Sequence, residues 1–67
     1  MEPYANLSGR SGVFQYEIGK EWIMIMFDKG EIRTYNYDEY GEDDVEEMKQ
    51  LAKSGEGLNR FLNENYK

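Results

Sequence analysis

The chain has 67 residues, with 14 acidic and 8 basic side chains, a formal net charge of −6, and neither cysteine nor histidine. This composition predicts one small domain and excludes disulfide bridges, thiolate chemistry and catalysis or metal binding by histidine. The net negative charge also disfavours nucleic acid as a partner, because a phosphate backbone is repelled unless the basic groups gather on one face.

The first ten residues show no hydrophobic periodicity. We therefore expect an irregular lead-in over residues 1–10 and a single domain over residues 11–66. The lead-in has neither the basic start nor the apolar stretch of a secretory signal, and no apolar run in the sequence approaches the roughly 20 residues of a membrane span. These absences favour a cytoplasmic protein without membrane contact.

The first predicted strand is Val13–Ile18, where apolar and polar residues alternate. The next two residues begin with Gly19 and suit a two-residue hairpin loop, because glycine adopts the positive φ that a type II′ turn requires at its first position. This loop sets Tyr16 opposite Ile23 in the following strand.

The apolar run Trp22–Phe27 is the centre of the predicted sheet. Six consecutive apolar residues between turn signals are typical of a strand that is buried on much of both faces. The stretch Asp28–Gly30 suits a three-residue loop whose glycine is left-handed. A third strand then follows as far as Tyr37.

Side chains alternate along each strand, so this pairing divides the meander into two faces. The face that we assign to the core is rich in aromatic and β-branched residues: Phe14, Tyr16, Ile18, Ile23, Ile25, Phe27, Tyr35 and Tyr37. The opposite face groups a tryptophan, two methionines and an isoleucine, which a solvated sheet face does not normally do. These four residues are Trp22, Met24, Met26 and Ile32.

Two helices are predicted after the sheet. Asp43 and Glu46 have the spacing of a capping box, and Lys49 lies toward the end of the same helix, where the helix dipole favours a cation. Gly55 suits a left-handed C-terminal cap, and a second stripe of helical period runs from Leu58 to Tyr66. The sequence thus predicts an α+β fold: a three-stranded antiparallel meander covered on one face by two short C-terminal helices.

The acids are concentrated in one segment, with seven of them between residues 38 and 47. Asp43, Asp44 and Glu47 are possible oxygen ligands for a hard cation, but the alternating ligands and turn glycine of a calcium loop are missing. Acidic side chains at the start of a helix are favoured by the helix dipole, which explains these acids without a metal. We therefore expect neither a metal nor a cofactor.

Several of these features together resemble the KTSC domain, a small module found at the C-terminus of some lysyl-tRNA synthetases and as a stand-alone bacterial protein. The resemblance covers about Leu7 to Tyr66 and rests on four features: the apolar strand that ends at Phe27, then Gly30, the triplet Tyr35-Asn36-Tyr37, and the stretch Ser54–Leu62. The family has no established function, and RNA binding has been suggested for it because of the synthetase fusion.

Trp22, Met24, Met26 and Ile32 are the first candidate site. Tryptophan and methionine are enriched where proteins meet, so this group predicts a surface for a protein partner or for a second copy in a homodimer. The alternative is structural: the N-terminal segment folds back over these residues through Tyr4 and Leu7. The sequence does not decide between the two.

Tyr35, Tyr37, Asn59 and Arg60 are the alternative site, for nucleic acid or another anion. Tyrosine rings stack on unpaired bases, and free amides at a helix start hold phosphate. Core packing of the tyrosines and local capping by the asparagine explain the same residues without a ligand. We therefore expect a binding module rather than an enzyme, whose concave pocket such a small domain can hardly form, with weak RNA binding as the alternative to protein binding.

Overall fold

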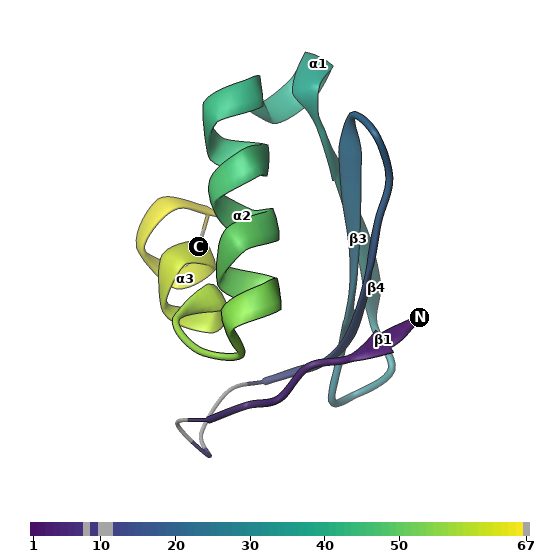
Figure 1. The fold of residues 1–67 in the computed structure, drawn as a ribbon, viewed down its shortest axis with the longest axis vertical. Helices are drawn as coiled ribbons and strands as arrows, with labels where there is room; N and C mark the ends of the chain where they lie inside the picture. Colours follow the sequence, from purple (N-terminus) through teal and green to yellow (C-terminus); the bar gives the residue numbers. More distant parts are fainter. Residues whose placement is uncertain (8, 10–11, 67) are drawn as a thin grey trace.

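Helices α2 and α3 lie on the same side of one antiparallel sheet, in a computed structural model that describes residues 1–7, 9 and 12–66 (Figure 1). The strands follow one another across the sheet in the order β1 (Glu2–Pro3), β2 (Val13–Ile18), β3 (Trp22–Phe27) and β4 (Ile32–Asn36). The helices are α1 (Tyr37–Tyr40), α2 (Glu42–Ser54) and α3 (Leu58–Tyr66). The predicted α+β class is confirmed, and the structure adds a short fourth strand and a one-turn helix.

The β2–β3 hairpin has a different register from the predicted one. Tyr16 pairs with Ile25 and not with Ile23, a shift of two residues. The backbone N–H of Gly19 donates to the carbonyl oxygen of Trp22 at 2.9 Å, so the loop consists of the two residues between them. Because the side-chain period of a strand is two, this shift leaves each side chain on its predicted face.

A β-bulge at the start of β2 does change the faces. Val13 pairs with Phe27 and Gln15 pairs with Met26, so Phe14 is an extra residue in β2. Val13 is consequently buried, whereas Phe14 is 58% exposed. The prediction that Phe14 belongs to the core is wrong, because it assumed unbroken alternation through this position.

The β3–β4 hairpin has the predicted register, and Gly30 in its loop has a left-handed φ of 88°. The strand nevertheless ends one residue earlier than expected, so Tyr37 begins α1. The side chain of Asn36 accepts a hydrogen bond from the backbone N–H of Glu39 at 2.8 Å and thereby caps this helix. An asparagine followed three residues later by a glutamate is a helix-start signal that our strand prediction overlooked.

The core fills the space between the sheet and the two longer helices. Its buried members are Tyr4, Val13, Ile23, Ile25, Tyr35, Val45, Met48, Ala52, Leu58 and Leu62. Both helices bury the stripes predicted for them, and α2 ends as predicted at the left-handed Gly55. The predicted capping box of α2 is absent, because the helix begins at Glu42 after Gly41 and has no side-chain cap.

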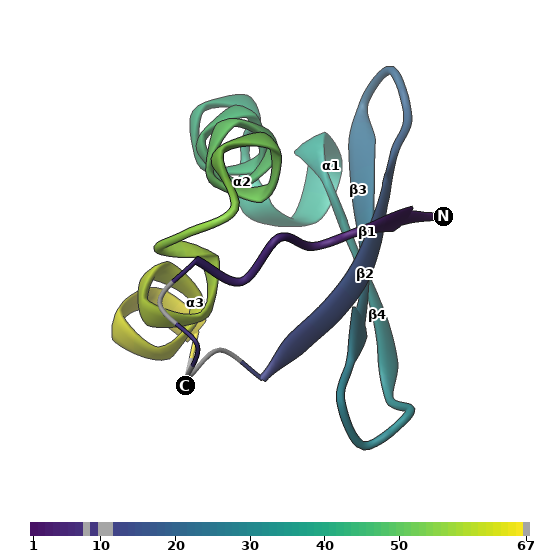
Figure 2. The same cartoon turned by 60° about the horizontal axis from the view of Figure 1, so that its bottom comes forward.

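Residues 1–7 of the N-terminal segment begin with the short strand β1 and then lie on the helical side of the sheet (Figure 2), where we predicted an irregular lead-in. After β1, the hydroxyl oxygen of the buried Tyr4 accepts a hydrogen bond from the N–H of Leu58 at 3.3 Å. Further along, the N–H of Leu7 donates to the carbonyl oxygen of Gly55 at 2.7 Å. The segment therefore runs from the sheet edge to the turn between α2 and α3 (Figure 2). Three positions of the predicted lead-in and domain start, 8, 10 and 11, lie outside the described residues.

Candidate functional site: the outer face of the sheet

One face of the sheet packs under the helices, and on the opposite face no helix of the described chain lies (Figures 1 and 2). We call this opposite face the outer face and define it by Trp22, Met24, Met26 and Ile32. The ladder pairs Met24 with Thr34 and Met26 with Ile32, while the intervening residues of β3 are buried beneath the helices. The predicted alternative cover, the N-terminal segment, packs instead into the core through Tyr4.

The apolar side chains of the outer face remain in contact with solvent. Ile32 is 50% exposed, and the other three are half-buried. Trp22 is held beside the β2–β3 loop because its indole lies against Gly19. A Cβ atom added at Gly19 would stand 2.0 Å from a ring carbon of Trp22, so only glycine leaves room for the ring in this position.

Polar residues of the neighbouring strands flank this apolar stripe. Gln15 and Glu17 of β2 pair with the two methionines, and Thr34 and Asn36 of β4 pair with Met24 and Trp22. An apolar centre rich in tryptophan and methionine, with a polar border, is the usual anatomy of a protein interface. The geometry of the outer face therefore suits protein recognition.

The residues of the alternative site are not brought together on one exposed surface. Tyr35 is 3% exposed, and its ring packs edge-on against Tyr40 with 4.8 Å between centroids. This burial raises the pKa of Tyr35. It also leaves the Tyr35 ring inaccessible to stacking by a nucleic-acid base. Asn59 is half-buried at the start of α3, whereas the exposed Arg60 pairs with Glu64 at 3.3 Å.

A pocket of about 300 Å³ lies between the start of β4 and α3. Its lining includes Tyr35 and Asn59 from the predicted anion site, together with Arg33. This arginine is already paired with Glu31 at 2.8 Å, and the volume is at the lower limit for ligand pockets. We therefore assign no ligand to this pocket.

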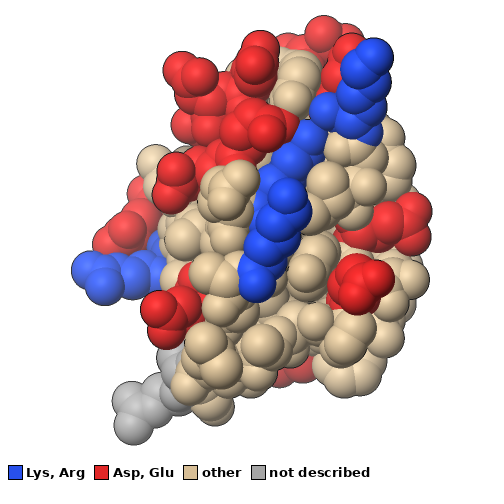
Figure 3. Space-filling view, in the orientation of Figure 1, with Lys and Arg blue, Asp and Glu red and all other residues tan. Residues whose placement is uncertain are grey.

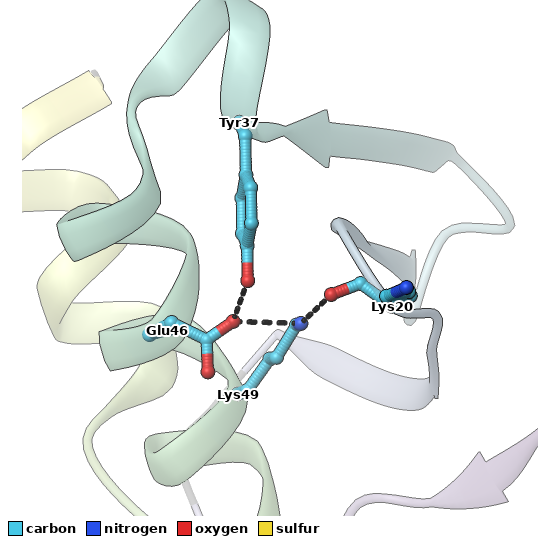
Figure 4. Close-up of polar contacts among 4 residues, drawn as sticks. All are labelled: Lys20, Tyr37, Glu46 and Lys49. Atoms are coloured by element: carbon cyan, nitrogen blue, oxygen red, sulfur yellow. Dashed lines mark hydrogen bonds and ion pairs between the residues drawn. The ribbon is translucent and has the colours of Figure 1, made fainter.

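Tyr37 belongs to a polar network that we did not predict (Figure 4). Its hydroxyl donates to a carboxylate oxygen of Glu46 at 2.5 Å, and the same oxygen lies 2.7 Å from the ammonium group of Lys49. Lys49 is only 6% exposed, and it also donates to the carbonyl oxygen of Lys20 at 3.0 Å. These bonds satisfy the buried ammonium and connect α1, α2 and the β2–β3 loop.

The network also shifts the ionisation of its members. The hydrogen bonds from Lys49 and Tyr37 hold the pKa of Glu46 below its usual value. The ammonium of Lys49 lies 5.3 Å from the centre of the Tyr37 ring, within cation–π range. These contacts connect the helices to the β2–β3 loop, with Lys49 buried and the Glu46 side chain partly exposed.

Two tyrosine hydroxyls are expected to make stability depend on pH in alkali. The hydrogen bond to Glu46 raises the pKa of Tyr37 to about 12, and the hydrogen bond to Asp44 raises the pKa of Tyr66 to about 12. Because the unfolded value is about 10, the stabilisation is complete below pH 10 and is lost as the pH rises toward 12. Denaturant unfolding across this range should show the decline, and the Tyr37→Phe/Tyr66→Phe double variant should flatten it. An equally steep decline in the double variant would assign the effect to other groups.

The acidic segment forms a separate surface. Figure 3 shows acidic side chains gathered over the part of the molecule where α1 and the start of α2 lie. They include Asp38 and Glu39 of α1 and the first three residues of α2. Within the described ranges, no group of three or more acids is arranged to hold a metal ion.

Comparison with known proteins found no family model, no curated protein and no solved structure that matches this chain. Within the part of the chain that the structure describes, no helix is both long enough and apolar enough to cross a membrane. A functional assignment has to come from the geometry of the chain itself, above all from its outer face.

Proposed function

We propose that this protein is a non-enzymatic binding module whose outer face docks against another protein. The observation that supports this proposal is the lack of cover over Trp22, Met24, Met26 and Ile32 in the described structure, where the N-terminal segment packs into the core through Tyr4. Removing apolar surface from water gains roughly 25 cal/mol per Å². A partner that seals this stripe would gain that energy, with the tryptophan as the natural anchor.

The charge of the outer face indicates what kind of partner fits. Its flanking residues include the half-exposed carboxylate of Glu17, which is paired with Met24 in the ladder and lies 3.9 Å from the Met1 ammonium group. The positions that the ladder places on this face carry no lysine or arginine. The whole chain has a net charge of −6, which attracts basic surfaces during diffusion. We therefore commit to a protein partner that presents an apolar patch bordered by lysine or arginine.

We also propose that the chain is a KTSC-like module. The two parts of the motif meet in one core, since Tyr35 of the tyrosine triplet is buried with Leu58 and Leu62 of the late stretch. Gly55, in the same stretch, ends α2 in the left-handed conformation. On this interpretation the motif residues specify the fold, and the outer face is where the binding function resides.

Trp22 makes the proposal directly testable, because it is the only tryptophan of the chain. We expect an amphipathic leucine–lysine peptide to shift the Trp22 fluorescence toward the blue, and a leucine–glutamate peptide of the same length to leave it unchanged. Met24→Glu should weaken the binding by about 30-fold or more, the size of a hot-spot loss. Leu7→Glu is the matched control, since Leu7 is exposed and apolar but lies away from the outer face.

The competing outcomes are separable. Equal binding by the wild type, Met24→Glu and Leu7→Glu would remove the outer face as the site. Titration with single-stranded RNA at low salt tests the alternative function. If RNA binds and Arg60→Glu abolishes that binding while Met24→Glu does not, the module recognises RNA and the protein-docking proposal is overturned. Circular dichroism and chemical unfolding verify that each variant is folded.

A further inference from the structure

Among the described strands, β4 has a neighbour on one side only. The strand order β1-β2-β3-β4 leaves it at an edge of the sheet, and it is the longer of the two edge strands. We propose that β4 pairs with β4 of a second copy, antiparallel and about a two-fold axis through Thr34. The two sheets then join side by side, and their outer faces form one continuous surface. This inference concerns the edge and does not depend on the partner proposed for the outer face.

The open edge carries backbone groups that are ready to pair. In an antiparallel ladder, residues alternate between directing both backbone groups toward the neighbouring strand and directing both away from it. The carbonyl oxygen of Glu31 accepts a bond from β3 at 2.7 Å, and the N–H of Tyr37 donates to the residue before β3 at 3.1 Å. The backbone N–H and C=O groups of the odd-numbered residues of β4 therefore point toward β3. Ile32 and Thr34, both exposed, direct their N–H and C=O groups outward.

The geometry selects one register among those that a two-fold axis permits. An axis through Thr34 sets Thr34 opposite itself and Ile32 opposite Asn36 of the second copy, so that outward groups meet along all five residues of β4. An axis through Arg33 would place two guanidinium groups directly opposite each other, which is unfavourable. An axis through Tyr35 would leave Ile32 facing the second copy's α1, outside the strand.

The charges along this edge match in the same register. Lys29 lies in the loop before β4, and Asp38 and Glu39 follow the end of β4 in α1. Arg33 at the start of β4 is already paired with Glu31, so Lys29 is the cation that this end offers to a second copy. Antiparallel pairing brings Lys29 of one copy beside Asp38 and Glu39 of the other, and the two-fold axis repeats this contact. The net charge of −6 opposes association at low salt, but beyond about 8 Å it is largely screened at physiological ionic strength.

The first test removes one outward N–H from each copy and therefore two hydrogen bonds from the dimer. Thr34→Pro deletes an N–H that does not bond to β3, and proline is tolerated at such edge positions. We expect sedimentation equilibrium at physiological salt to show a wild-type dimer with a Kd below about 1 mM. Thr34→Pro should weaken the dimer at least tenfold, whereas Thr34→Val, which keeps the N–H, should not. A strictly monomeric wild type up to that concentration would overturn the proposal.

A charge exchange tests the register and does not rely on proline. Lys29→Glu makes both ends of the seam acidic, and the double substitution Asp38→Lys/Glu39→Lys makes both ends basic, so each variant alone should dimerise more weakly than the wild type. An equimolar mixture restores both attractive contacts and should form the heterodimer. A mixture that associates no better than either variant alone would refute the antiparallel seam. Met24→Glu should leave the dimer intact, so failure here is distinguishable from failure of the outer-face proposal.

Discussion

Ile25→Ala is expected to lower the free energy of unfolding by about 2–5 kcal/mol. Ile25 is completely buried on β3 beneath the helices, so truncation removes apolar contacts and leaves a cavity that the neighbouring side chains only partly fill. Small domains are stable by about 5–15 kcal/mol in total, and a chain of 67 residues lies toward the lower end. Urea unfolding followed by circular dichroism measures the loss.

Ile32→Ala is the matched control, because it removes the same atoms from the opposite face. Ile32 lies on β4 in the same sheet and is 50% exposed. We expect its truncation to cost less than about 1 kcal/mol, as is usual for surface substitutions. Equal losses for the two variants would mean that the outer face is covered in solution. The comparison therefore tests the assignment of the two faces, on which the proposed function rests.

The two faces of β3 and β4 were predictable because alternation tolerates an error of two residues. The predicted β2–β3 loop was misplaced by one residue on each strand, yet Ile23 and Ile25 still lie inward and Met24 still lies outward. An error of one residue would have reversed every side chain. The bulge reverses the side-chain direction locally, at Phe14. Strand β2 contains no glycine or proline that would signal this bulge in the sequence.

Features that depend on distant contacts were not predictable from local pattern. Lys49 has the sequence environment of a helix-surface cation, and its burial depends on the carbonyl oxygen of Lys20, 29 positions away. Tyr4 has no periodic neighbours, and its buried place depends on Leu58, 54 positions away. The second case decides the candidate site, because the path of Tyr4 determines that the N-terminal segment leaves the outer face open.

The passage of the N-terminal segment over the end of α2 leads to the second large effect. Gly55→Ala is expected to lower the free energy of unfolding by about 2–4 kcal/mol, from two sources. Gly55 has a φ of +83°, which costs a non-glycine residue about 1–2 kcal/mol. An added Cβ would also stand 2.6 Å from the Cβ of Ala5, closer than two such atoms can approach.

Gly30→Ala separates these two sources. Gly30 has a similar φ of +88°, but an added Cβ there meets nothing within 4 Å, so its substitution should cost only the conformational part, about 1–2 kcal/mol. The extra loss of stability at Gly55 should then shrink when Ala5→Gly is combined with Gly55→Ala, because Ala5→Gly removes the methyl group with which the new Cβ collides. If Gly55→Ala costs no more than Gly30→Ala, the N-terminal segment does not lie against the end of α2. The segment would then be free to cover the outer face, and the case for an open docking surface would fail with it.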